Sequence, residues 1–161
     1  MTKTIFSKDP ANKRMLIQRA FSAPLEQVWK AWTDSALLDQ WWAPKPWKAV
    51  TKSMEFKEGG VWLYYMQGPE GEQSWAKATY KNIIPLKSFE AVDAFCDEQG
   101  VDSAEFPSMQ WKTAFKTSEK GTFVEIEIVF SSPEDMEKII ELGFQEGFAA
   151  AHDNLDELLA N

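Results

Sequence analysis

The chain has 161 residues, a formal net charge of −8, one Cys and one His, and 44% of its residues are hydrophobic. Its length and apolar content fit one packed domain, its acidity argues against nucleic acid as a partner, and a lone Cys with a lone His excludes an internal disulfide and a zinc site. The feature that remains to be explained is an aromatic fraction of 14%, which includes eight Trp residues.

The first segment, residues 1–13, is polar, and we expect it to be flexible or to add an edge to a sheet. Residues 14–161 are expected to form a single domain. We find no signal-peptide pattern and no apolar run long enough for a transmembrane helix, so we expect a cytoplasmic protein that does not insert into membranes.

The next segment predicts a strand over 14–21, followed by two short helices over about 24–42. Pro24 suits the first position of a helix, and Thr33-Asp34-Ser35 reads as a break with a new helix cap. Pro44 and Pro46 end the second helix.

The middle of the chain predicts strands with tight antiparallel turns. Apolar and β-branched runs cover about 47–56, 61–66, 73–84, 86–95, 109–117 and 122–130. Within 109–115, Met109, Trp111 and Phe115 alternate with polar residues, so their side chains are expected to point inward.

The C-terminal third predicts one long amphipathic helix over about 133–159, with Ser132 as its cap. Gly143 and Gly147 fall on or beside its apolar stripe. Two interpretations stay open: another surface approaches closely there, or the helix softens and kinks.

This order predicts an α+β helix-grip fold: a curved antiparallel sheet of about six to seven strands wrapped around the long helix. A fold of this kind leaves room for a cavity between the sheet and the helix, and such apolar cavities bind small ligands.

Five sequence segments resemble one known family. These are 24–34 (PLEQVWKAWTD), 37–44 (LLDQWWAP), 55–62 (EFKEGGVW), 143–148 (GFQEGF) and 153–159 (DNLDELL). Together they are similar to the heat-shock protein 90 ATPase activator-like family of the START-like (SRPBCC) superfamily, over about 14–160. The resemblance implies the helix-grip fold and a link to the stress response. It does not choose a function, because that superfamily includes lipid carriers, hormone-binding proteins, polyketide cyclases and co-chaperone domains.

Aromatic and Met residues on strand faces and on the last helix are the candidates for a ligand pocket. Tyr64, Trp111, Phe144 and Phe148 are expected to bound it. The full candidate set is Trp41, Trp62, Tyr64, Met66, Trp75, Met109, Trp111, Phe115, Phe144 and Phe148. For each of them the alternative is ordinary core packing. In the Trp41–Trp42 pair, either one indole reaches the cavity or both pack the helices onto the sheet.

No catalytic or metal-binding pattern accompanies these aromatics, and no cofactor is expected. His152 reads as a partly exposed helix residue without a role, and Cys96 as an inert thiol. Three functions remain open: a binder of a hydrophobic or aromatic small molecule, lipid or polyketide-like, without catalysis; a chaperone ATPase activator-like interaction module; and an aromatase/cyclase-like enzyme. The oligomeric state stays open as well.

Overall fold

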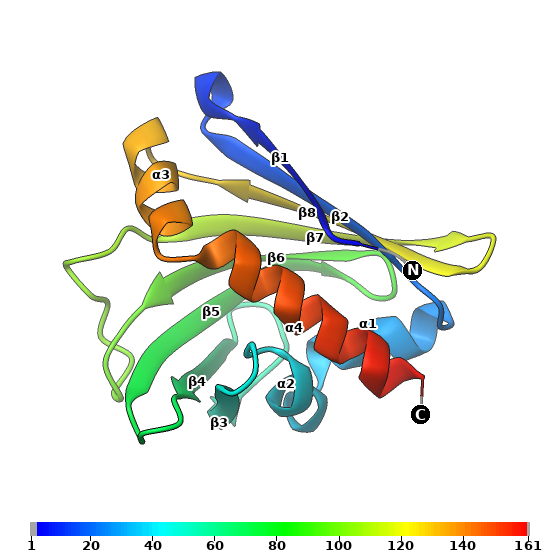
Figure 1. Cartoon of the computed structure of the whole chain (residues 1–161), viewed down its shortest axis with the longest axis horizontal. Coiled ribbons are helices and arrows are strands. Elements are labelled where there is room, and N and C mark those ends of the chain that lie inside the picture. Colours follow the sequence, from blue (N-terminus) through cyan, green and yellow to red (C-terminus); the bar gives the residue numbers. More distant parts are fainter. Residues whose placement is uncertain (1–2, 161) are drawn as a thin grey trace.

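The computed structural model describes residues 3–160, which form a curved antiparallel sheet with helix α4 lying across its concave side (Figure 1). Within this part of the chain the sheet has eight strands, in the order β1-β2-β8-β7-β6-β5-β4-β3. The strands are β1 (Ile5–Asp9), β2 (Arg14–Phe21), β3 (Lys48–Met54), β4 (Val61–Gln67), β5 (Gln73–Ile84), β6 (Ser88–Phe95), β7 (Met109–Ser118) and β8 (Gly121–Val129). The helices are α1 (Leu25–Thr33), α2 (Ser35–Trp41), α3 (Pro133–Glu141) and α4 (Phe144–Leu159), with a 3₁₀ turn at Pro10–Asn12.

The sheet contains one more strand than the upper end of the prediction. This extra strand is β1, in which Ile5 to Asp9 pair antiparallel with Gln18 to Arg14 of β2. Its five residues are too short and too polar to give a clear strand signal in the sequence. Residues 1 and 2 of the predicted N-terminal segment lie outside the described part of the chain.

The C-terminal third is two helices, so the prediction of one long helix is wrong. The break lies at Leu142 and Gly143, where Gly143 has a φ of 87°. A residue in this left-handed region cannot continue an α-helix. Because Ile140 and Phe144 keep an apolar spacing across the break, periodicity alone did not reveal it. In Figure 1, α3 leaves the line of α4 at this point.

The two short helices after β2 agree with the prediction. Asp34 caps α2 by accepting a hydrogen bond from the backbone N–H of Ala36 at 2.9 Å. The Trp41 indole then donates to the backbone carbonyl of Ala31 at 2.9 Å, which ties α2 to the end of α1. This tie turns Trp41 and Trp42 toward the interior of the molecule.

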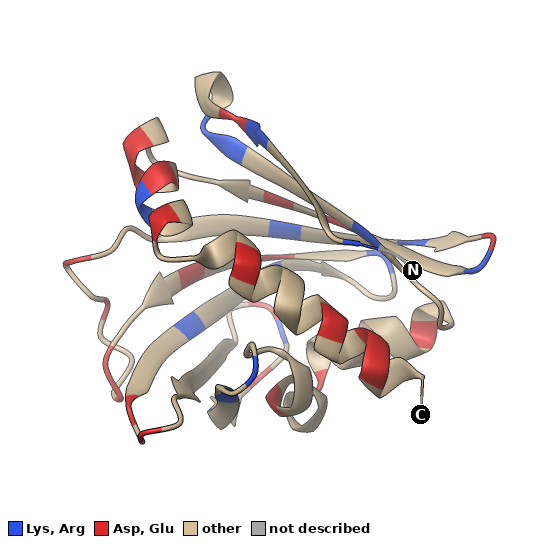
Figure 2. Cartoon of the chain, viewed as in Figure 1, with Lys and Arg blue, Asp and Glu red and all other residues tan. Residues whose placement is uncertain are grey.

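Successive side chains of a strand point to opposite faces of the sheet, so every second residue of a strand faces the helices. Trp111 and Phe115 of β7 are buried, as predicted, together with Val124 and Ile126 of β8. Acidic residues recur along α4 (Figure 2), and Glu146, Asp153 and Glu157 of this helix are exposed. None of the helices in residues 3–160 is both long enough and apolar enough to cross a membrane.

Candidate functional site

A partly enclosed cavity of about 420 Å³ lies between the concave face of the sheet and the helices. Its walls come from β4, β5, β6 and β7, from the segment that joins α2 to β3, and from the junction of α3 and α4. The lining residues are Trp42, Pro44, Tyr64, Met66, Ser74, Ala76, Lys77, Asp93, Ala94, Phe95, Phe106, Met109, Trp111, Ile139, Leu142, Gly143, Phe144, Gly147 and Phe148. Most of these side chains are apolar or aromatic, which is the composition of a small-molecule site.

Six of the ten predicted pocket residues line this cavity: Tyr64, Met66, Met109, Trp111, Phe144 and Phe148. They include all four residues expected to bound it. Phe144 and Phe148 lie one helical turn apart on α4 with their rings stacked at 5.4 Å. The Trp111 ring meets the Phe148 ring edge-on at 5.6 Å from the sheet side. Aromatic side chains from helix and sheet therefore meet at one wall.

Two of the predicted residues lie in the core instead of the cavity wall. Trp41 is fully buried and packs against Trp32 with 4.6 Å between ring centroids. Phe115 lies farther along β7, where its ring contacts Trp29 at 5.1 Å. Helices α1 and α2 cover this part of the sheet, so no open space remains there.

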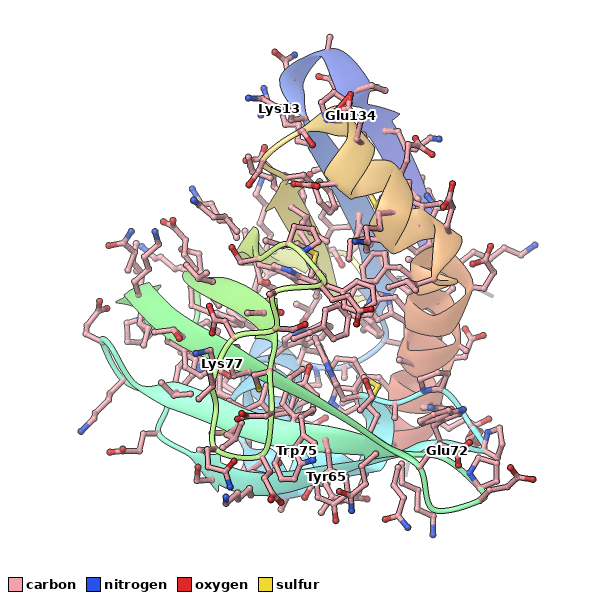
Figure 3. The ribbon with its side chains drawn as sticks, turned by 90° about the vertical axis from the view of Figure 1, so that its left-hand side faces the viewer. Lys13, Tyr65, Glu72, Trp75, Lys77 and Glu134 are labelled. Atoms are coloured by element: carbon pink, nitrogen blue, oxygen red, sulfur yellow. The ribbon has the colours of Figure 1, made fainter. Side chains whose placement is uncertain are left out.

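Trp62 and Trp75 are the other two predicted residues that do not line the cavity. Trp62 is buried beneath Tyr64, whose ring stacks on it at 3.8 Å. Trp75 packs against Tyr65 at 4.7 Å on the side of the sheet that faces away from α4 (Figure 3). Trp75 is on β5 directly opposite Tyr65 of β4, and residues paired in this way share a face.

Trp42 is a lining residue that the candidate set omitted in favour of its neighbour. Its indole Nε1–H donates a hydrogen bond to the Tyr64 hydroxyl at 3.0 Å, and both groups are buried. The sequence showed two adjacent Trp residues, and adjacent helix residues point about 100° apart. Only the packing of α2 decided which of the two reaches the cavity.

Asp93 is the lining residue that sequence reasoning missed altogether. It follows Phe89 and Ala91 at alternate positions of β6, and it pairs with Ala78 of β5 and Met109 of β7. These residues belong to the concave face, so the exposed area that Asp93 keeps opens into the cavity. The sequence did hold a signal for this position, because the Asp93 carboxyl occupies an alternate position of a strand whose other alternate positions are apolar and buried.

No hydrogen bond or ion pair holds the Asp93 carboxyl among the residues that the structure describes. Burial among apolar side chains raises the pKa of Asp93 from 3.8 to about 8. At neutral pH the carboxyl is therefore largely protonated. An acid that is neutral at pH 7 both donates and accepts hydrogen bonds.

Tyr64 and Trp111 add two polar groups to the apolar wall. Burial and the nearby Asp93 carboxyl raise the pKa of Tyr64, while the hydrogen bond from Trp42 opposes this shift. The hydroxyl thus stays protonated and keeps its own hydrogen to donate. The Trp111 Nε1–H is buried without a partner within residues 3–160. Asp93, Tyr64 and Trp111 are the set that we call the polar wall.

Lys77 is the single Lys or Arg among the lining residues of the described chain, and its ammonium is engaged elsewhere. Its Nζ lies 2.6 Å from a carboxylate oxygen of Asp102 and donates to the backbone carbonyl of Gly100 at 2.8 Å. The cavity therefore offers no uncommitted positive charge to an anionic ligand.

His152 is buried, so the expectation of a partly exposed histidine is wrong. It is 1% exposed and its ring lies 4.2 Å from Phe148. The Thr4 hydroxyl accepts a hydrogen bond from Arg19 and is hydrogen-bonded to His152 Nδ1 at 2.8 Å. His152 does not line the cavity, and burial together with the Arg19 charge lowers its pKa to about 3. It serves as a neutral packing residue.

Arg19 joins the same buried cluster to the surface of α4. Its guanidinium bonds to Asp153 at 2.9 Å and to Asp156. The cluster fastens β2 to α4 and so fixes the helix over the concave face. In residues 3–160, no group of three or more His, Cys, Asp or Glu side chains is placed to hold a metal ion.

The sequence matches the model of one protein family, described as Activator of Hsp90 ATPase homolog 1-like protein, over residues 22–160. No curated protein matches the chain.

Several solved bacterial structures share the fold. A protein of Arthrobacter aurescens, solved by NMR, is 31% identical with a TM-score of 0.91, over 97% of this chain and 91% of that one. A crystallised protein of Mycobacterium smegmatis is 25% identical with a TM-score of 0.90, over 98% and 96% of the two chains. A Nitrosomonas europaea protein is 24% identical with a TM-score of 0.81, over 93% and 96% of the chains, and agrees in fold.

Proposed function

Because the chain belongs to the Activator of Hsp90 ATPase homolog 1-like family and encloses an aromatic-lined cavity, we propose that it binds a hydrophobic or aromatic small molecule without catalysis. The single observation that carries this proposal is the cavity. Its volume of about 420 Å³ lies within the range of about 300–1,000 Å³ that is typical of small-ligand sites. Trp42 and Trp111 line it, so an occupant would change their fluorescence.

The proposal is tested with N-phenyl-1-naphthylamine, a neutral apolar dye, and with native mass spectrometry of the purified protein. We expect saturable dye binding with quenching of tryptophan emission, or a co-purified apolar molecule that organic extraction removes. Absence of any saturable binding by the dye and by a panel of apolar compounds would overturn the proposal.

A matched pair of variants ties the binding to this cavity. Ala76 lies on the concave face of β5 and lines the cavity, so Ala76→Phe places a ring inside it. Thr79→Phe puts the same ring on the other face of the same strand, since side chains three residues apart point to opposite faces. Ala76→Phe should abolish dye binding, and Thr79→Phe should leave it unchanged.

The family description supports a second candidate function, stimulation of the ATPase of the Hsp90 chaperone. A pull-down with Hsp90 and a measurement of its ATP hydrolysis test this directly. Binding with stimulation that persists in Ala76→Phe would favour a surface interaction over the cavity. Neither binding nor stimulation would remove this candidate.

A further inference from the structure

The polar wall formed by Asp93, Tyr64 and Trp111 shows an incomplete hydrogen-bonding pattern. Buried polar groups in folded proteins are normally paired, and each unpaired one carries a free-energy penalty. Here the Trp111 N–H has no partner, and no bond holds the Asp93 carboxyl within the described residues. The Tyr64 hydroxyl accepts from Trp42, and within residues 3–160 its own hydrogen has no hydrogen-bond acceptor. Of these groups, the Asp93 carboxyl keeps exposed area in the cavity, while the Trp111 N–H is shielded from it, so the carboxyl is the unpaired group that a ligand can reach.

Register explains why these groups belong to one region of the wall. Asp93 is in line across the sheet with Ala78 and Met109, while Trp111 is on β7 two residues beyond Met109. Tyr64 is on β4 beside Ala76, and its position is fixed by the bond from Trp42. The small Ala76 side chain lines the cavity between β4 and β6.

The charges of the cavity lining limit the kind of ligand that can bind there. A carboxylate ligand would meet Asp93 with no free cation, because Lys77 is held by Asp102 at 2.6 Å. A charged amine would pair with an ionised Asp93 but would leave the hydrogen of the Tyr64 hydroxyl facing a group that accepts nothing. A hydroxyl group donates one hydrogen bond and accepts others, so it alone of the three matches both kinds of group.

We propose that the ligand is a neutral molecule with an apolar or aromatic body and a hydroxyl group that donates a hydrogen bond to the Asp93 carboxyl and accepts one from the Tyr64 hydroxyl. This inference rests on the proposed ligand-binding function and specifies its substrate class. Asp93 acts as the anchor of specificity, and Phe144 and Phe148 supply contact with the ring system.

The test compares three probes of the same shape: naphthalene, 2-methoxynaphthalene and 2-naphthol. Only 2-naphthol has a hydrogen to donate, while its methyl ether keeps the acceptor oxygen. Affinities are measured at pH 7 by displacement of N-phenyl-1-naphthylamine. We expect 2-naphthol to bind at least about tenfold more tightly than 2-methoxynaphthalene, the effect of one buried hydrogen bond to a carboxyl.

Variants of β6 assign the preference to one side chain. Asp93→Leu keeps the branched shape without polar atoms and should abolish the preference for 2-naphthol. Asp93→Asn keeps an acceptor oxygen and should retain it, which separates loss of the anchor from loss of folding. Glu90→Leu removes a carboxyl three residues away on the outer face, where Glu90 bonds to Asn82, and should retain the preference.

The outcomes separate this inference from the function on which it rests. If none of the three probes and no other apolar compound binds, the proposed function fails. If the probes bind but 2-methoxynaphthalene equals 2-naphthol, the binding function stands and the hydroxyl inference is overturned. The inference is likewise overturned if Asp93→Leu keeps the full preference.

Discussion

The unpartnered carboxyl of Asp93 makes a quantitative prediction about stability, which Asp93→Asn tests. Apolar burial holds the pKa of this carboxyl at about 8 in the folded protein, against 3.8 when it is free in water. Between these values the folded chain keeps a proton that the unfolded chain has lost. The contribution of Asp93 to stability is therefore highest at acidic pH and falls as pH rises from about 4 to about 8.

The magnitude follows from the two pKa values. Their difference corresponds to about 6 kcal/mol of ionisation free energy, at about 1.36 kcal/mol per pKa unit. Between pH 6.5 and 8.5 the predicted loss is about 2 kcal/mol.

Comparison of Asp93→Asn with the parent protein isolates Asp93 from the other buried titratable groups. His152 is neutral in the folded chain, where its pKa is about 3, while the unfolded histidine, with a pKa of 6.5, still loses part of a proton above pH 6.5. Tyr64 and Tyr80 face Asp93, and burial raises the pKa of both above the interval. Burial also raises the pKa of the Cys96 thiol. The contributions of His152 and Cys96 are common to the parent protein and to Asp93→Asn, so they cancel in the difference between the two proteins and leave the contribution of Asp93.

The assay is urea denaturation of the ligand-free protein and of Asp93→Asn at pH 6.5 and 8.5. The stability advantage of the variant should grow by about 2 kcal/mol between the two pH values. Glu90→Gln removes a carboxylate from the exposed side of the same strand and should follow the pH dependence of the parent protein. Parallel pH profiles for the parent and Asp93→Asn would refute the reasoning.

Three further predictions concern other parts of the molecule. The parent protein should lose about 2 kcal/mol of stability between pH 6.5 and pH 5, because the unfolded histidine takes up a proton that the buried ring, with its pKa of about 3, does not. His152→Gln should remove this loss. If urea denaturation gives the variant and the parent the same pH dependence of stability, the prediction is wrong. Gly147→Ala should stabilise the protein by about 0.5–1 kcal/mol, since alanine favours a helix and the added Cβ would lie at an ordinary contact distance of 3.6 Å from Pro44. Gly143→Ala should destabilise the protein by about 1 kcal/mol, because the φ of Gly143 is 87°. Melting temperatures that shift in the same direction for both variants would contradict this pair of predictions. The Ser132 side chain caps α3 by accepting a hydrogen bond from the backbone N–H of Asp135 at 3.1 Å. Ser132→Ala should therefore lower the stability of the protein by about 1 kcal/mol. An unchanged urea midpoint would show that the cap does not stabilise the protein.

Local sequence signals were sufficient for most elements of the fold. Asp34 and Ser132 marked helix starts, because a short polar side chain that accepts a backbone N–H is a local interaction. Alternation in β7 predicted that Trp111 points inward. The same logic failed at Gly143, where the apolar spacing continues through a left-handed residue that ends the helix. It also missed β1, whose stability comes from pairing with β2 rather than from its own pattern.

The sequence by itself determined that aromatic residues would gather on the concave face, since strand alternation and helical spacing are local and periodic. Only the tertiary structure decided which of them border open space. Trp41 and Phe115 are covered by packed helices, while Trp42 and Tyr64 meet at the cavity through one hydrogen bond. The meaning of Asp93 was also decided there, because the pKa of a carboxyl depends on what surrounds it. The excess of aromatic residues thus forms a core that leaves a cavity unfilled, and the Asp93 carboxyl faces that cavity.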